Sequence, residues 1–274
     1  MPLLHILLLV GAGLVGGFLA GLVGIGGGVI FAPVLFVYFQ TIGVSPELVT
    51  PLTLGSSLFC TLLASLSSTY FHTRRRAVIW QLALWTGVFS ALAVSATTRF
   101  MTTQPWYDKE VFQAVFSTLL LLVSLRMFIQ QKEQEVKENM PQFRLPVVAA
   151  TGTIAGMIAA AAGVGGGVVM VPAFHRFLKV PVHRAVATSS ATIVFISMAG
   201  VLSYMWRGWN VPVDLPALGY VDVGHALLLA IPAILTARLG VYTAHRMQTV
   251  WLRRSFAVVA MLIAVRLLYR VLAG

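Results

Sequence analysis

The chain has few charged residues. Only 10% of its 274 residues are Asp, Glu, Lys or Arg, whereas an ordinary soluble domain has about a quarter. Hydrophobic residues make up 58% of the chain, and the mean hydropathy is +0.89. This composition excludes a sizeable water-soluble domain. It predicts an integral membrane protein that is surrounded by a lipid bilayer.

Acidic residues are the scarcest charged type. The chain has eight of them, and all fall in predicted loops or at the edges of apolar segments: Glu47, Asp108, Glu110, Glu133, Glu135, Glu138, Asp214 and Asp222. Cation pumps and proton relays commonly place carboxylates inside the membrane. Because none is evident inside an apolar segment, the sequence disfavours an exporter of metal or drug cations.

Cysteine and catalytic motifs are also scarce. The only cysteine, Cys60, excludes an internal disulfide, and its apolar neighbours indicate a packing role. The chain has no His-Glu-x-x-His motif, no paired carboxylates and no Gly-x-Ser-x-Gly turn, the arrangements typical of metal or nucleophilic chemistry. We therefore expect no enzyme, no metal site and no cofactor.

The net charge of +11 is high, as in many nucleic-acid-binding proteins. Here, however, the basic residues cluster at the ends of apolar segments, where membrane topology places them. We therefore expect no nucleic-acid partner.

Apolar segments divide the chain into two similar sets. The first falls near residues 3–25, 28–42, 52–71, 78–98 and 111–130, and the second near 146–164, 167–178, 186–206, 223–244 and 251–273. A polar linker separates the two sets. The sequence thus predicts an internal duplication with an N-terminal repeat at 1–130, a cytoplasmic linker at 131–145 and a C-terminal repeat at 146–274.

A glycine triplet occurs once in each half, inside apolar sequence. The first triplet is Gly26, Gly27 and Gly28, and the second is Gly165, Gly166 and Gly167. Pro33 and Pro172 follow the two triplets at the same distance. A break there exposes backbone groups where water is scarce, so protein or a ligand must satisfy them. A duplicated break is typical of the substrate site of a transporter.

The triplets suit an anion. Glycine lets backbone N–H groups approach a ligand closely, and a helix that begins after the triplet presents unpaired N–H groups and its positive dipole end. This arrangement binds anions without a charged side chain. The alternative is close helix packing, which we assign to the other early glycines, Gly11, Gly13, Gly16, Gly17 and Gly21.

Hydroxyl groups form the second candidate set. Ser56 and Ser57 begin an apolar helix in the first half, and Thr188 and Ser189 do so at matched positions in the second. A neutral hydroxyl can donate a hydrogen bond to an anion. The alternative is a hydrogen bond to the backbone of its own helix.

The distribution of Lys and Arg predicts the orientation of the halves. If the run Arg74–Arg76 is cytoplasmic, an inverted second half places six basic residues inside and three outside. The inside group is Arg176, Lys179, Arg184, Arg246, Arg253 and Arg254, and the outside group is Arg207, Arg266 and Arg270. Asp214, Asp222 and the N-terminus then lie outside. The remaining basic residue within an apolar segment, Arg238, is expected to extend to the interface, with a place on the transport pathway as the alternative.

The predicted fold is therefore an all-α polytopic membrane protein with two homologous, inverted repeats. Each repeat contains a helix interrupted by the triplet, or a re-entrant hairpin, followed by three transmembrane helices. The sequence does not choose between ten spans and six spans with two hairpins.

Two longer motifs, Gly21–Pro33 and Ala162–Pro172, resemble those of the TauE/SafE family, the sulfite exporter group of bacterial and archaeal membrane proteins. Gly55-Ser56-Ser57 and Ala187–Ser190 add to the resemblance. It implies secondary transport of small sulfur-containing anions, such as sulfite, sulfoacetate or other organosulfonates, across the inner (cytoplasmic) membrane by alternating access. An anion channel and a non-transporting accessory subunit are the alternatives, and a homo-oligomer is compatible with both. Arg76 stands where many members carry glycine.

Overall fold

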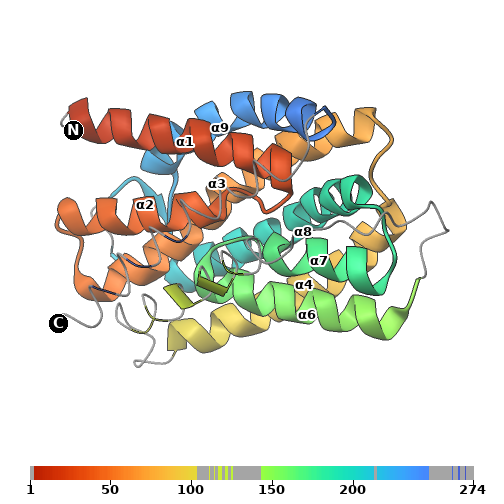
Figure 1. The fold of residues 1–274 in the computed structure, drawn as a ribbon. Helices are drawn as coiled ribbons and strands as arrows, with labels where there is room; N and C mark the ends of the chain where they lie inside the picture. Colours follow the sequence, from red (N-terminus) through yellow and green to blue (C-terminus); the bar gives the residue numbers. More distant parts are fainter. Residues whose placement is uncertain are drawn as a thin grey trace.

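A computed structural model describes residues 3–103, 143–212 and 215–246, together with positions 111, 114, 117, 118, 121, 122, 125, 261, 265 and 269. The long helices are α1 (Leu3–Val23), α3 (Pro46–Arg74), α4 (Trp80–Thr103), α6 (Leu145–Ala162), α8 (Val182–Gly208) and α9 (Val223–Ala244). Two shorter helices, α2 (Gly28–Thr41) and α7 (Gly167–Phe177), follow the triplets, and β1 (Ala217–Leu218) pairs with β2 (Val221–Asp222) in an antiparallel hairpin (Figure 1).

The predicted all-α polytopic class is confirmed. Within the described ranges, five helices are long and apolar enough to cross a membrane: α1, α3, α6, α8 and α9. Apart from the scattered positions given above, the predicted third helix of each repeat, near 111–130 and 251–273, lies outside the described residues, as does most of the linker at 131–145.

Both triplets break a helix where the sequence predicted. Gly27 precedes α2 with a φ of 72°, and Gly166 precedes α7 with a φ of 74°. This left-handed backbone is open to glycine at little cost and strained for other residues. The chain therefore reverses at each triplet instead of continuing as one helix.

Each reversal forms a hairpin. The ring of His5, in the first turns of α1, lies 5.6 Å from the ring of Tyr38, near the end of α2. The end of α2 thus returns to the side where α1 begins. Figure 1 shows α6 and α7 forming a second hairpin that opens toward the opposite end of the molecule.

The helices of the two halves pack in matching ways, with α1 corresponding to α6, α3 to α8 and α4 to α9. α1 packs along α9 and α6 packs along α4, while α3 and α8 pack against each other at the centre. The two central helices run antiparallel, because Ser68 bonds to Ser190 while a Cβ on Gly55, further toward the start of α3, would touch Tyr204, near the end of α8.

Small residues allow the α1–α9 contact. A Cβ added to Gly13, Gly17 or Gly21 would lie 2.2–2.3 Å from a backbone oxygen of α9, so the packing role predicted for these glycines is confirmed. Gly16 packs on the ring of Phe31. The packing interpretation is wrong for Gly11, because nothing lies within 4 Å of its added Cβ.

The predicted start of the helix near residue 52 is also wrong. α3 begins at Pro46 and contains Pro51, so the residues just before position 52 are helical. Pro46 occupies the first turn of α3, where the missing N–H of a proline has no intrahelical partner. Ser56 follows Gly28 by 28 positions, whereas Thr188 follows Gly167 by 21. The difference arises because α2 is three residues longer than α7, and because α3 begins four residues earlier before Ser56 than α8 does before Thr188.

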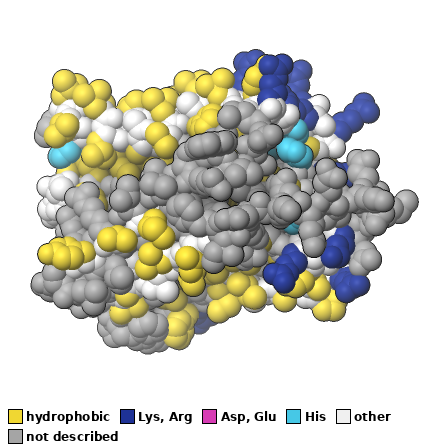
Figure 2. Space-filling view, in the orientation of Figure 1, with side chains coloured by type: hydrophobic (Ala, Val, Ile, Leu, Met, Phe, Trp, Pro, Cys, Tyr) yellow, Lys and Arg dark blue, Asp and Glu magenta, His cyan; other side chains and the backbone are white. Residues whose placement is uncertain are grey.

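Basic residues gather at one end of the molecule (Figure 2). There, α3 and α9 end and α8 begins, and the ring of His245 lies 5.6 Å from His72 and 5.7 Å from His183. The described residues that were predicted to be cytoplasmic lie in these helix ends, in the last turn of α7 or in the adjoining turns: Arg74, Arg75, Arg76, Arg176, Lys179, Arg184 and Arg246. Arg253 and Arg254 lie outside the described residues. Arg238 is exposed and stacks over the ring of Phe71 at 5.7 Å, as the interface interpretation requires.

Candidate anion site

The two triplets meet at the centre of the molecule. A Cβ added to either Gly26 or Gly165 would lie 2.9 Å from Cγ2 of Thr61 and 3.0–3.1 Å from Cγ2 of Ile193. Thr61 is halfway along α3, and Ile193 lies on α8. The two predicted breaks, far apart in the sequence, therefore face the same pair of side chains.

Each short helix also begins against the opposite repeat. A Cβ on Gly28 would lie 2.4 Å from the carbonyl oxygen of Gly163, and one on Gly167 would lie 2.3 Å from that of Gly24. Only hydrogen fits at these two positions. The contact is reciprocal, so the starts of α2 and α7 come together at one place.

The first amides of both helices are available to a ligand. In α2, Ile30 and Phe31 are the first to donate, both to the carbonyl of Gly27. In α7, Val169 and Met170 are the first, both to the carbonyl of Gly166. The amides before them have no acceptor within their helix, and they carry the positive end of the helix dipole. Two such ends create a positive potential without a fixed charge.

The four candidate hydroxyls connect the halves. Ser57 donates to the carbonyl of Gly163 and Ser189 donates to that of Gly24, each at 2.9 Å. Ser56 accepts from the amide of Asp222 at 2.9 Å, and Thr188 accepts from the amide of Ile79 at 3.0 Å. These bonds reach backbone segments in the opposite half of the chain, so they differ from the predicted alternative of local backbone bonds. A role of these hydroxyls in binding an anion stays a prediction.

Thr61 is a candidate that sequence reasoning missed. Its side chain is completely buried, and its Oγ1 has no hydrogen-bond partner. This hydroxyl lies 2.9 Å from the position of a Cβ on Gly28, at the start of α2. A buried hydroxyl without a partner costs free energy, which a bound anion would recover. The available signal was its spacing, since Thr61 follows Ser57 by one helical turn.

The site is closed in this conformation. Both triplets and the glycines that precede them are buried. A small cavity beside Gly27 has an apolar lining of Leu19, Val23, Ile25, Val29 and Ile30. An anion would reach the triplet amides only after the packing around them opens.

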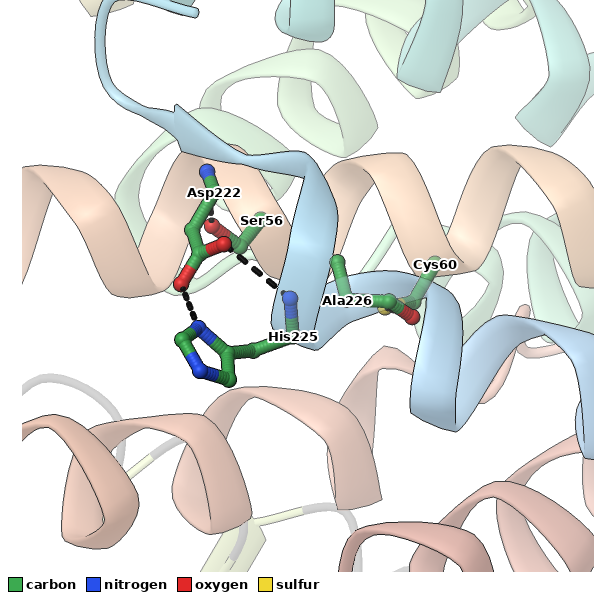
Figure 3. A network of polar contacts seen from close by, with 5 residues as sticks. All are labelled: Ser56, Cys60, Asp222, His225 and Ala226. Carbon is green, nitrogen blue, oxygen red and sulfur yellow. Dashed lines mark hydrogen bonds and ion pairs between the residues drawn. The ribbon is translucent and has the colours of Figure 1, made fainter. Parts of the chain in front are cut away.

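A second polar cluster lies nearer the end where α9 begins (Figure 3). Asp222 was expected in a solvated outer loop, but it is completely buried. Its Oδ1 accepts from the amide of His225 at 3.1 Å, and its Oδ2 pairs with His225 Nδ1. The expectation that no acid lies in the interior is therefore wrong for Asp222. The chain before α9 folds inward, where the amide of Tyr220 donates to the carbonyl of Tyr204.

Comparison with known proteins identifies the family. Residues 9–267 match the family model described as "Sulfite exporter TauE/SafE". The chain belongs to the TauE/SafE family. No solved structure matches it.

Three relatives of this TauE/SafE protein bear the name of probable membrane transporter proteins. One from Methanocaldococcus jannaschii is 30% identical over 87% of this chain and 86% of its own. One from Haemophilus influenzae is 26% identical over 95% and 96%, and one from Bacillus subtilis is 26% identical over 96% and 97%. The family and these names support a multi-pass membrane transporter rather than an enzyme.

Proposed function

We propose that this TauE/SafE protein is a secondary transporter of small sulfur-containing anions, such as sulfite, sulfoacetate or other organosulfonates, across the cytoplasmic membrane. The observation that carries the proposal is the reciprocal contact of the two triplets around Thr61. Two helix starts, each with unpaired amides, face one point beside an unpartnered buried hydroxyl. This combination favours an anion with several acceptor oxygens.

Sulfite and sulfonates match this chemistry. Each presents three oxygens in a pyramid, so amides from two sides and one hydroxyl can be satisfied together. The site contains helix dipoles and no lysine or arginine, so it holds the anion without a permanent ion pair. The anion can therefore dissociate from the site as well as bind to it, which a carrier requires. The basic end of the molecule raises the local anion concentration (Figure 2).

We infer that the repeats are inverted and that transport proceeds by alternating access. The equivalent helices α3 and α8 pack antiparallel, and the hydrogen bonds from Ser57 and Ser189 are exchanged when the halves are exchanged. Inverted halves can adopt two conformations that open to opposite sides of one central site. The burial of both triplets favours such a carrier over an open anion channel.

The decisive experiment compares Thr61→Val with Thr61→Ser. Valine keeps the shape and removes the hydroxyl, so we expect about a tenfold loss of anion affinity, while serine keeps the affinity within about twofold. The purified proteins would be tested by thermal shift with sulfite, sulfoacetate, sulfate and thiosulfate, because a bound ligand raises stability. Uptake of the same labelled anions into proteoliposomes would follow.

Thr98→Val is the matched control, since Thr98 in α4 is also buried with an unpartnered hydroxyl. It should leave affinity and uptake unchanged. Equal affinity in the wild type and Thr61→Val would contradict the proposed site. Single-channel conductance without counterflow would show a channel instead, and an absence of binding to every anion tested would favour an accessory subunit.

A further inference from the structure

Asp222 and His225 form a titratable pair that the anion site does not use. The Asp222 side chain is completely buried, and that of His225 is 16% exposed. Among the residues that the structure describes, Asp222 is the only buried carboxylate. An ionisable group in the interior of a membrane protein is expensive and is typical of a functional site.

The pair lies between the outer end and the triplets. The amide of Asp222 bonds to Ser56, ten residues after α3 begins at Pro46. At 1.5 Å per residue this is about 15 Å along the helix. Thr61 lies five residues further, about 7.5 Å deeper. A charge on the pair is therefore close enough to act on an anion at the triplets.

The neighbours of the pair provide no compensating cation. From α2, the ring of Tyr38 lies 5.1 Å from that of His225, and His5 of α1 contacts Tyr38 in turn. From α3, Cys60 donates to the carbonyl of Ala226, and Tyr220 lies in the turn before β2. No lysine or arginine of the described ranges contacts the pair, so its charge acts directly on its surroundings.

The architecture does not require an acid at this position. Ser56 accepts the amide of Asp222 just before α9, and Thr188 accepts the amide of Ile79 just before α4. The two arrangements are equivalent in the two halves, but the position that Asp222 holds in the second half is held by Ile79 in the first. Capping of the following helix by a hydroxyl in the opposite half thus works without a carboxylate. The acid and its histidine are an addition on one side of the molecule.

We propose that the Asp222–His225 pair is a proton-binding site that couples proton movement to anion transport. Taking up one proton raises the charge of the pair by one, whichever of the two residues holds it. At roughly 10 Å from the triplets, this change should tighten anion binding about tenfold. By reciprocity the anion tightens proton binding by the same factor, so both ligands favour the same loaded state. This inference rests on the proposed transport function.

The test uses Asp222→Asn in proteoliposomes. Asparagine caps a helix as well as aspartate does, so the variant should fold while losing the carboxyl group. With [35S]sulfoacetate, an inward proton gradient should drive net uptake by the wild type. In the variant, the rate of this net uptake should fall at least about tenfold below that of the wild type. Its rate of anion exchange should stay within about twofold of the wild type, because exchange of loaded sites needs no proton release. His225→Gln should move the pH profile of net uptake.

Glu47→Gln is the matched control. Glu47 lies in the first turn of α3, at the same end as the pair, but it is exposed, and its replacement should leave proton-driven uptake unchanged. Net uptake by the wild type that ignores the pH gradient, or Asp222→Asn with normal proton-driven uptake, would overturn the inference alone. A wild type that neither exchanges nor accumulates [35S]sulfoacetate, sulfite, sulfate or thiosulfate would overturn the transport proposal as well.

Discussion

Ser57 donates a 2.9 Å hydrogen bond to the carbonyl oxygen of Gly163, although 106 positions of sequence separate them. Ser189 makes the equivalent bond to Gly24 in the other direction. The serine of each repeat thus satisfies the carbonyl that the glycine break of the other repeat exposes. The two halves are thereby joined at the level of the candidate site.

Removal of these hydroxyls should destabilise the protein. Ser57→Ala or Ser189→Ala leaves a buried carbonyl without its partner, so we expect each to lower the unfolding free energy by about 1–2 kcal/mol. Thermal unfolding in detergent would measure the loss. Ser90→Ala is the control, because the buried Ser90 donates to the carbonyl of Thr86 within its own helix. An effect no larger than that of the control would show that the cross-repeat bonds are unimportant.

The starts of the short helices should accept only glycine. A Cβ on Gly28 or Gly167 would lie within 2.4 Å of a backbone oxygen of the opposite repeat, so Gly28→Ala and Gly167→Ala should each cost several kcal/mol or prevent folding. Gly11→Ala meets open space and should gain up to about 1 kcal/mol, since alanine favours a helix. Size-exclusion profiles and melting temperatures would separate these outcomes. A monodisperse, stable Gly28→Ala variant would contradict the close contact.

Acid should destabilise the basic end of the protein. The pKa of His245, which follows α9, is lowered by burial and then by the positive charges of Arg75 and His183. The unfolded chain therefore binds a proton at about pH 6.5 while the folded chain does not yet do so. The contribution of the neutral His245 to the free energy of unfolding is therefore present above that pH and is lost as the pH falls below it. Melting temperatures should fall between about pH 7.5 and pH 5.5, and less steeply in His245→Gln.

A melting temperature that does not change over that range, or the same slope in both proteins, would show that His245 does not titrate with folding.

The orientation can be tested with cysteine labels. The native Cys60 is completely buried, and Cys60→Ala provides the background. Glu47→Cys should react with a membrane-impermeant maleimide added outside intact cells, whereas Arg184→Cys should react only after permeabilisation, because the positive-inside rule predicts that the basic end faces the cytoplasm. Labelling of both positions from the same side would contradict the proposed inversion.

The glycine breaks could be predicted because they depend on local chemistry. Gly27 and Gly166 have a backbone φ that favours glycine, and their duplication is visible as a repeat. Arg76, where the family resemblance led us to expect glycine, also has a left-handed backbone, with a φ of 53°. Glycine tolerates this conformation better than arginine does.

Other features depended on partners that the sequence does not name. Gly11 and Gly13 look alike in the chain, but only Gly13 faces α9. Asp222 stands at the edge of an apolar segment and was interpreted as solvated, yet the chain before it folds inward and buries it. Thr61 became a candidate only when both triplets were found against its side chain.

The sequence by itself determined the membrane class, the positions of the two glycine breaks and the gathering of basic residues, because hydropathy, charge and glycine content act over short stretches of chain. The tertiary structure alone decided that the breaks meet, that each serine reaches across to the other repeat, and that one carboxylate is buried beside a histidine. Those contacts join helices that are far apart in the chain, so their formation depends on the packing of the whole molecule.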